Sequence, residues 1–233
     1  MGLVGVLSDA HGNIEAFDAG VGLLRRLGAR EFFFLGDAVG YIPSADVVRR
    51  LMEMGGTVRC VLGNHEAMLL AGNPDPERDV VYQLERTRDM LSPREIGFIE
   101  SWPASIDAAL GRFRTRFVHG SPAEPTYGYV YPDTDLAPFG RPADYVFLGN
   151  SHHPFVRWSD DCCFVNPGSC GLPRDDGSSG SVALFDTEAG TVVVHRYSIE
   201  LANEKLLRDL PGLHPSVVAV MSRRKDTIHG TRS

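Results

Sequence analysis

The most informative segment of the chain is Leu7-Ser8-Asp9-Ala10-His11-Gly12-Asn13. It joins the apolar run 3–7, which is typical of a buried strand, to residues 14–27, whose apolar positions follow the period of a helix. An aspartate and a histidine therefore lie on the turn that leaves the carboxyl end of a strand, where open α/β sheets bind their ligands. Such a pair can place a carboxylate oxygen and an imidazole nitrogen on one cation, although Asp and Asn also cap helices and shape turns.

Length and composition indicate an ordinary globular protein. The 233 residues suggest one domain, or one domain with an appendage, and 43% of them are hydrophobic. The net charge of -7, without a long basic run before the C-terminal tail, argues against an extended nucleic-acid surface. No apolar stretch approaches bilayer length, the N-terminus lacks the features of a signal peptide, and the cysteines form no CxxC pair. We therefore expect a cytoplasmic protein with reduced thiols and no membrane contact.

Two further buried strands are predicted at 32–35 and 58–62, with helices at 14–27 and 44–54 between the three strands. This alternation predicts a parallel sheet with right-handed crossovers. A charged helix is expected over 77–91. Ser92 and Glu95 then form the capping box of another helix, in which Pro93 takes the first position.

The second half of the chain predicts shorter elements. Strands are expected at 113–118 and 145–148, on either side of a long loop at 121–142. Four more apolar segments predict mostly antiparallel strands of a second sheet, at 155–158, 162–165, 182–185 and 192–195. A helix over 199–210 would end the domain, so we expect a domain at 1–210 and a loosely held tail at 211–233.

Polar side chains follow five of the predicted strands. These residues are Asp9 and His11, Asp37, Asn64 and His65, His119, and Asn150 and His152. If the strands share a sheet, the clusters meet at one edge of it. Each residue alone has an ordinary interpretation as a turn residue, a helix cap or a core histidine, but five such clusters together indicate a metal site.

These motifs resemble, in their order, those of the calcineurin-like metallophosphoesterases. The matching segments are Asp9-x-His11, Gly36-Asp37, Gly63-Asn64-His65, His119-Gly120 and Gly149-Asn150-Ser151-His152. Asn166-Pro167-Gly168-Ser169, followed by Leu172-Pro173-Arg174-Asp175, resembles the small bacterial branch, which includes phosphodiesterase-like proteins often labelled diadenosine tetraphosphatase-like. The resemblance spans residues 1–200. It implies a four-layer αββα sandwich of two facing mixed β-sheets.

The resemblance also implies a role for each motif residue. One metal would be held by Asp9, His11, Asp37 and His152. Asp37 would bridge to a second metal, which Asn64 and His119 would hold. His65 would bind no metal; it would contact the phosphate and protonate the leaving oxygen.

The implied activity is hydrolysis of a small phosphate ester, with a diester or a nucleotide favoured, by attack of a metal-bridging hydroxide. Two cations about 3.5–4 Å apart neutralise the phosphate charge and acidify a shared water. Mixed oxygen and nitrogen ligands suit Mn²⁺, Fe, Zn²⁺ or Ni²⁺ better than Ca²⁺. Analogy with the family favours two Mn²⁺ ions.

One motif departs from the family pattern, in which the fifth motif is Gly-His-x-His. This chain has Asn150 in place of the first histidine, which normally completes the second metal site. Asn150 would ligate less tightly through its amide oxygen, or water would fill the position, or the asparagine is an engineered replacement. A shifted register would let His153 substitute.

Other candidates are less specific. Asn13 could contact phosphate or a metal-bound water, or simply cap the following helix. Arg174 could bind a substrate phosphate, or form a surface ion pair with Asp175 or Asp176. The loop aromatics could stack on a base, cover the cleft or only pack the loop; they are Tyr127, Tyr129, Tyr131 and Phe139.

Three alternative functions remain open at this point. The first is a phosphomonoesterase. The second is a weakly active or non-catalytic scaffold of the same fold, which Asn150 favours and the other motif residues oppose. The third is a nuclease, which the acidic net charge opposes. The sequence does not specify an oligomeric state.

Overall fold

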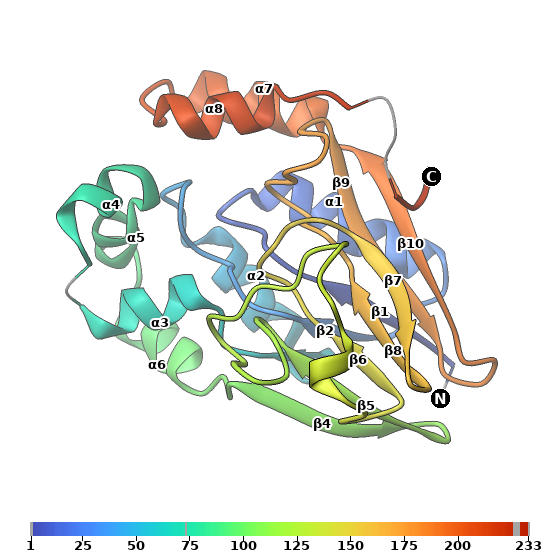
Figure 1. Cartoon of the computed structure of the whole chain (residues 1–233). Coiled ribbons are helices and arrows are strands. Elements are labelled where there is room, and N and C mark those ends of the chain that lie inside the picture. Colours follow the sequence, from blue (N-terminus) through green and yellow to red (C-terminus); the bar gives the residue numbers. More distant parts are fainter. Residues whose placement is uncertain (1, 73, 226–228, 233) are drawn as a thin grey trace.

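A computed structural model describes residues 2–72, 74–225 and 229–232 of the chain. Two mixed β-sheets face each other and helices flank them (Figure 1), which confirms the predicted α/β sandwich. Within these described ranges, no helix has both the length and the apolar character needed to cross a membrane.

The first sheet has the strand order β11-β10-β9-β1-β2-β3. Its strands are β1 (Leu3–Leu7), β2 (Glu31–Phe34), β3 (Val58–Cys60), β9 (Ser179–Asp186), β10 (Thr191–Ser198) and β11 (Thr231–Arg232). β1, β2 and β3 are parallel, with Val4 beside Glu31 and Phe32 beside Val58. The connections are α1 (Ile14–Arg26) and α2 (Asp46–Met54), the latter followed by the 3₁₀ turn η1 (Gly55–Thr57). The predicted alternation of strands and helices is therefore confirmed.

The second sheet has the strand order β4-β5-β6-β8-β7. Its strands are β4 (Ser105–Leu110), β5 (Phe113–Val118), β6 (Tyr145–Phe147), β7 (Phe155–Ser159) and β8 (Cys162–Asn166). β6 is parallel to β5 and to β8, whereas the two outer pairs are antiparallel. The central strands therefore direct their carboxyl ends the same way.

The predicted membership of the second sheet is wrong for two of its four segments. β7 and β8 lie in that sheet, but β9 and β10 extend the first one, where β9 pairs antiparallel with β1. Alternation of apolar and polar residues specifies a strand but not its partner. β9 is buried along most of its length, which suits a position between two other strands.

Phenylalanine rings fill the space between the sheets. Phe33 on β2 stacks on Phe117 of β5, with ring centroids 3.6 Å apart and planes 4° apart. Phe147 on β6 lies 5.0 Å from Phe117, and all three side chains are fully buried. Each such burial contributes about 1.5–3 kcal/mol. These contacts hold the sheets face to face, so the turns beyond their strands meet.

The outer faces of the two sheets are covered differently. α1 and α2 pack on the first sheet through residues such as Phe17 and Leu51. The second sheet is covered largely by the loop 121–142, which contains the 3₁₀ helix η2 (Ala137–Phe139) and buries Val130 and Leu136.

Four short helices follow β3. They are α3 (Asn64–Ala71), α4 (Pro76–Tyr82), α5 (Leu84–Asp89) and α6 (Pro93–Glu100). The prediction of a single helix over 77–91 is wrong, because Gln83 has a φ of 55° and separates α4 from α5. The Asp79 carboxylate accepts a hydrogen bond from the first backbone N–H of α5 and stabilises this break. The capping box of Ser92 and Glu95 is confirmed.

The segment after residue 210 is not simply a loosely held tail, as was predicted. α7 (Glu200–Asp209) is followed by α8 (Pro215–Met221), whose Val217 and Met221 are buried in a cluster with Ile42 and Leu172. The apolar positions of α8 lie on one side at helical spacing, and Pro215 takes its first position. The packed domain therefore extends beyond residue 210.

Candidate metal centre

The polar clusters come together where the two sheets meet, rather than at the edge of one sheet. The first sheet contributes Asp9 and His11 after β1, Asp37 after β2, and Asn64 and His65 after β3; the second contributes His119 after β5, and Asn150 and His152 after β6. Hydrogen bonds connect the two sets. Nδ1 of His119 donates to the Leu35 carbonyl at 2.6 Å, and the backbone N–H of Asn150 donates to Oδ2 of Asp9 at 3.2 Å.

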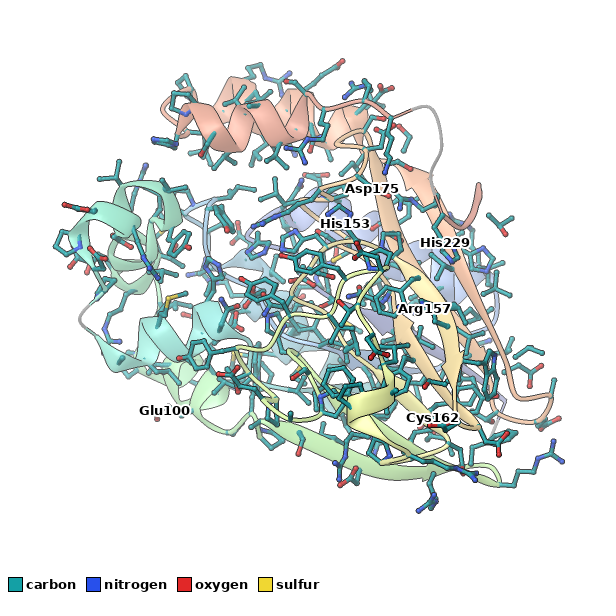
Figure 2. The ribbon with its side chains drawn as sticks, in the orientation of Figure 1. Glu100, His153, Arg157, Cys162, Asp175 and His229 are labelled. Atoms are coloured by element: carbon teal, nitrogen blue, oxygen red, sulfur yellow. The ribbon has the colours of Figure 1, made fainter. Side chains whose placement is uncertain are left out.

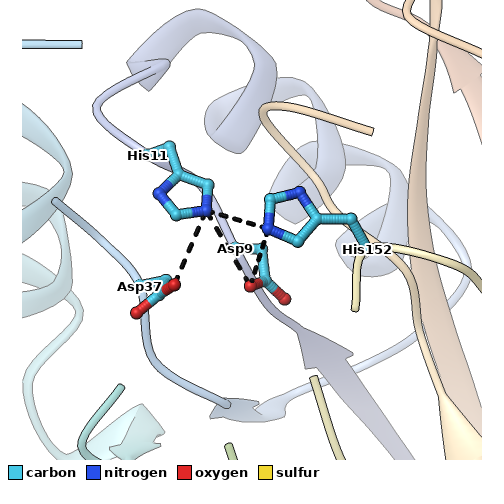
Figure 3. A group of neighbouring side chains, drawn as sticks. All are labelled: Asp9, His11, Asp37 and His152. Carbon is cyan, nitrogen blue, oxygen red and sulfur yellow. Dashed lines mark hydrogen bonds and ion pairs between the residues drawn. The ribbon is translucent and has the colours of Figure 1, made fainter. Parts of the chain in front are cut away.

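Four of these side chains form a compact buried group, which Figure 3 shows. Asp9, His11, Asp37 and His152 each place one potential ligand atom within 4.8 Å of the others. Nε2 of His11 lies 3.1 Å from Nε2 of His152 and 3.6 Å from Oδ2 of Asp37. Nε2 of His152 lies 3.3 Å from Oδ1 of Asp9. Imidazole nitrogens and carboxylate oxygens together are a donor set that divalent transition metals accept.

Backbone carbonyl groups orient the imidazoles. Nδ1 of His11 donates to the Val39 carbonyl at 3.0 Å, and Nδ1 of His152 donates to the Leu172 carbonyl at 2.6 Å. Because a carbonyl oxygen can only accept, Nδ1 carries the hydrogen in each ring, as it also does in His119. Nε2 of the neutral ring then presents a lone pair to the centre of the cluster. Outer hydrogen bonds of this kind are typical of metal-binding histidines.

Several acceptors of the group face one another with no donor between them. Burial lowers the pKa of His11 to about 3 and the pKa of His152 well below its usual value, so both rings are neutral at pH 7. Their Nε2 lone pairs are therefore directed at each other across 3.1 Å. Oδ1 of Asp9 is buried without a hydrogen-bond partner, and burial raises the pKa of this carboxyl to about 7. Because unpaired buried acceptors are costly, these residues fit a bound cation.

Asp37 lies between this group and a second pair of side chains. Its Oδ2 is 3.6 Å from Nε2 of His11 and 3.4 Å from Nε2 of His119. Nε2 of His119 in turn lies 3.0 Å from Oδ1 of Asn64. Burial opposes the charge on Asp37, but the neighbouring histidines outweigh it and hold the pKa of this carboxyl well below its usual range. Asp37 likewise outweighs burial at His119 and raises its pKa to about 9.

His65 lies beside the group and is held differently from the other histidines. Its Nε2 is 4.0 Å from Oδ2 of Asp37, and its backbone N–H donates to Oδ1 of the same carboxylate at 3.0 Å. The ring packs against the rings of His11, Tyr41 and Tyr82 at centroid distances of 4.9, 4.8 and 4.7 Å. Its buried Nδ1 has no hydrogen-bond partner, so no carbonyl directs Nε2 toward a metal.

Unusual backbone conformations concentrate at this centre. Left-handed φ angles between 48° and 62° occur at Asp9, His11, Asp37, Asn150 and His152. Such conformations cost of order 1–3 kcal/mol each and persist where function and packing require them. Gly63 shows how closely the turns approach, because a side chain there would collide with Oδ1 of Asp37.

Glu66 belongs to the centre although it was not among the predicted site residues. Its carboxylate accepts backbone hydrogen bonds from Asp37 at 2.7 Å, and from Val39 and Gly63 at 3.1 Å each. It therefore ties the turn after β2 to the start of α3 and fixes the backbone of Asp37. The available signal was its position, the third residue of a helix, where a capping box places an acidic side chain.

We expect Glu66→Gln to lower the free energy of unfolding by about 1–3 kcal/mol. The amide nitrogen that replaces a carboxylate oxygen cannot accept, so a buried backbone N–H loses its partner. Urea unfolding measures the change. Glu53→Gln is the matched control, because Glu53 is exposed and pairs with Arg50 at the surface. An unchanged free energy of unfolding in Glu66→Gln would contradict the assigned bridging role.

Asn150 is held by the loop that covers the second sheet. Its Nδ2 donates to the carbonyl groups of Tyr127 at 3.4 Å and Gly128 at 3.0 Å. Oδ1 takes part in neither bond, so metal ligation by this oxygen stays a prediction.

The shifted register involving His153 is not supported. His152 joins the group of four, whereas His153 borders a separate cavity with Arg157, Asp175 and His229 (Figure 2).

Asn13 acts as a helix cap. Its Oδ1 accepts from the backbone N–H of Ala16 at 3.3 Å, and its Nδ2 donates to the Gly171 carbonyl and to Oδ1 of Asn203. Because both ends of the amide are engaged inside the protein, the predicted substrate contact is not supported.

Arg174 lies beside the centre and does not form the surface ion pair that was its alternative. Its Nη2 donates to the hydroxyl of Tyr41 at 2.9 Å, while Asp175 pairs with Arg196 at 2.7 Å. Across the described part of the chain, no carboxylate lies within ion-pair distance of Arg174. Its guanidinium charge is therefore available to an anion.

The aromatic residues of the loop 121–142 divide into two groups. Tyr127, Tyr129 and Tyr131 are exposed, and the rings of Tyr129 and Tyr131 stack with centroids 5.9 Å apart. Phe139 instead packs on Phe164 of the second sheet. Phe139 therefore has the packing role that was one of the alternatives, whereas the three tyrosines remain exposed.

Comparison with known proteins identifies a family whose model matches most of this chain. The model of the calcineurin-like phosphoesterase superfamily domain matches residues 3–190. An uncharacterized protein of Methanocaldococcus jannaschii is 28% identical over 232 residues, covering 89% of this chain and 93% of that protein. A probable metallophosphoesterase of Methanothermobacter thermautotrophicus is 28% identical over 188 residues, covering 80% and 87%. A crystal structure of a metallophosphoesterase from Sphaerobacter thermophilus aligns with a TM-score of 0.75 at 24% identity, covering 94% and 98%.

Proposed function

The chain belongs to the calcineurin-like phosphoesterase superfamily, and from this premise we propose that it hydrolyses a small phosphate ester with two divalent transition-metal ions. A phosphodiester or a nucleotide is the favoured substrate. The observation that carries the proposal is the position of Asp37, whose Oδ2 lies within 3.6 Å of Nε2 of both His11 and His119. A pair of metal ions requires a carboxylate that lies between two sets of metal-ligand atoms, and Asp37 has this position.

The proposed ligands form two sets that share Asp37. Asp9, His11 and His152 would hold the first ion, as the distances within their group of four support. Asn64 and His119 would hold the second, with Asn150 as a weaker donor. Manganese is the proposed metal, and the same donors accept Fe, Zn²⁺ or Ni²⁺.

Bound metal ions would neutralise the phosphate charge and lower the pKa of a water molecule shared between them. The protein supplies the rest of the chemistry. Its buried carboxylates and imidazoles are pre-oriented by backbone hydrogen bonds, so little reorganisation is needed during the reaction. His65, whose Nε2 lies 4.0 Å from Oδ2 of Asp37, would contact the phosphate and donate a proton to the leaving oxygen. Arg174, which bonds to the Tyr41 hydroxyl, would pair with a phosphate oxygen.

The proposal predicts that hydrolysis depends on bound metal. Protein stripped with a chelator should show no turnover, and addition of Mn²⁺ should restore hydrolysis of a chromogenic phosphodiester together with two bound ions per chain. Metal analysis and a turnover screen of nucleotides and simple phosphate esters measure both quantities. A chain that binds no metal after incubation with Mn²⁺, Zn²⁺ or Ni²⁺ would rule the proposal out.

The same screen separates the alternative functions. A preference for monoesters would indicate a phosphatase. A scaffold of this fold, for which Asn150 is the favouring observation, would bind metal weakly and turn over nothing. Cleavage of single-stranded oligonucleotides in preference to the small diester would indicate a nuclease, against the net charge of -7.

Asn150→His should tighten metal binding at the second site and raise kcat about tenfold, which needs only about 1.4 kcal/mol of transition-state stabilisation. An imidazole here can donate one N–H to the Gly128 carbonyl that Asn150 now uses and turn its other nitrogen to the metal. Parallel metal titrations and turnover of both forms test this. If neither quantity rises, Asn150 lies off the metal or is the donor to which the enzyme is adapted.

A further inference from the structure

A cavity of about 420 Å³ next to the proposed metal centre is lined by residues of α4 and α8. Both helices are labelled in Figure 1. Pockets that bind small molecules typically measure about 300–1,000 Å³. Its apolar walls and the charge at its inner side come from Tyr41, Val81, Tyr82, Arg174, Val217 and Val220. The C-terminal helix α8 therefore forms one wall, opposite α4.

The inner wall of this cavity is in direct contact with the metal centre. The ring of Tyr41 lies 4.8 Å from the rings of both His11 and His65, and the ring of Tyr82 lies 4.7 Å from that of His65. Tyr41 and Tyr82 therefore line the cavity and also contact the histidines of the centre. A molecule in the cavity would lie beside the two rings that contact these histidines.

Arg174 lines the cavity and contacts Tyr41, whose ring in turn contacts His11 of the metal centre. Its guanidinium lies 6.0 Å from the centre of the Tyr41 ring and bonds to the Tyr41 hydroxyl. An arginine without a carboxylate partner in the described structure, at the border of the cavity and the centre, suits an anionic group of a ligand.

The lining combines ring and aliphatic surfaces with a polar edge. Tyr41 and Tyr82 meet edge to face, with centroids 5.2 Å apart and planes 79° apart. Glu77, Arg78 and Ser216 add an acceptor, a donor and a hydroxyl to the lining. A flat ring with hydrogen-bonding groups on its rim matches this combination, whereas a short alkyl group would leave most of the space and all of the polar edge unused.

We propose that this cavity binds the nucleobase of a nucleoside phosphate ester whose phosphate extends past Arg174 to the metal centre. The inference rests on the proposed phosphoesterase function and specifies its substrate class. Stacking on aromatic side chains supplies base affinity with little dependence on base identity, so both purine and pyrimidine esters should be accepted.

Two diesters with the same leaving group test the proposal. Adenosine 5′-(4-nitrophenyl phosphate) and methyl 4-nitrophenyl phosphate both release 4-nitrophenolate, and they differ in the group that would occupy the cavity. With the Mn²⁺-loaded full chain, kcat/KM should be about tenfold or more higher for the adenosine ester. The uridine ester should share this advantage. Equal kcat/KM for the nucleoside and methyl esters would overturn the proposal.

A substitution that fills the cavity locates the effect. Val220→Trp should bring the ratio of the two kcat/KM values close to one, because the indole takes the space of the base. Ala219→Trp places the same side chain on the neighbouring exposed position of α8 and should keep the wild-type ratio. If Val220→Trp does not fold, Val81→Trp on the opposite wall makes the same test. A nucleoside preference that survives a filled cavity contradicts the proposal.

The proposed function and the base site can fail separately. If neither diester is hydrolysed and AMP also survives intact in the presence of the protein, the phosphoesterase function fails. Calorimetric titration with AMP and with ribose 5-phosphate, which lacks the base, then measures the preference directly. Binding of AMP about tenfold or more tighter, lost in Val220→Trp and kept in Ala219→Trp, supports the base site, whereas equal affinities overturn it.

Discussion

Asp37→Asn should cost the protein more metal than any other single substitution at the centre, with a loss of at least about 100-fold in affinity. Oδ2 of Asp37 lies 3.6 Å from Nε2 of His11 and 3.4 Å from Nε2 of His119, so its charge acts on both proposed ions. The asparagine removes that charge from two sites at once. Phosphoester hydrolysis should fall with the metal, since the remaining donors hold each ion with one ligand fewer.

The substitution is conservative in every other respect. The side-chain oxygen of asparagine can still accept the backbone N–H of His65, as Oδ1 of Asp37 does at 3.0 Å. Metal content after equilibrium dialysis at several Mn²⁺ concentrations measures the loss. Asp9→Asn is the comparison, because Asp9 lies on the side of His152 and should affect mainly one ion. If Asp37→Asn still binds two ions with wild-type affinity, Asp37 does not bridge them.

Local sequence patterns were sufficient to predict the elements that carry the site. The apolar runs of β1 and β2, the alternation of apolar and polar residues in β5, and the capping box of Ser92 and Glu95 depend on neighbouring residues alone. All were confirmed. The turns after those strands follow from the same patterns. The ligand-type residues could therefore be named before their distances were known.

Features that depend on distant contacts were not predictable in the same way. The pairing of β9 with β1 joins Leu3 to Asp186, and no local pattern specifies which of two sheets a strand enters. Gln83 breaks a charged helix through a left-handed φ that glutamine rarely adopts. For α8 a signal did exist, since Leu213, Val217 and Met221 recur at four-residue spacing, but their burial depends on packing beside Ile42.

The candidate site likewise contains residues that local patterns predicted and residues whose role depends on distant contacts. Asp9, His11, Asp37 and His152 were predicted because a strand end and a residue type suffice to nominate a ligand. Glu66 was not, because its role is to accept N–H groups from a turn that is remote in sequence. The cavity between α4 and α8 also required the structure, since its walls are brought together by the fold and share no motif.

His65→Ala should keep both metals and lose about 10²–10⁴-fold in kcat, the usual range for general acid–base assistance. The Nε2 of His65 lies 4.0 Å from Asp37, and its ring is held by Tyr41 and Tyr82 instead of by a carbonyl that would turn it toward an ion. Removing the ring therefore leaves the proposed ligands in place. Metal analysis and turnover of the same preparation give the two quantities together.

The leaving group of the substrate distinguishes a proton donor from a residue that only shapes the site. A phenolate leaving group needs a proton more than 4-nitrophenolate does, so the loss in His65→Ala should be largest for phenyl esters and shrink for 4-nitrophenyl esters. A purely structural effect would lower both rates equally. Because the truncation also leaves space beside Tyr41 and Tyr82, His65→Gln provides a larger side chain for comparison and should show the same dependence on the leaving group. Loss of a metal ion in either variant would instead identify His65 as a ligand.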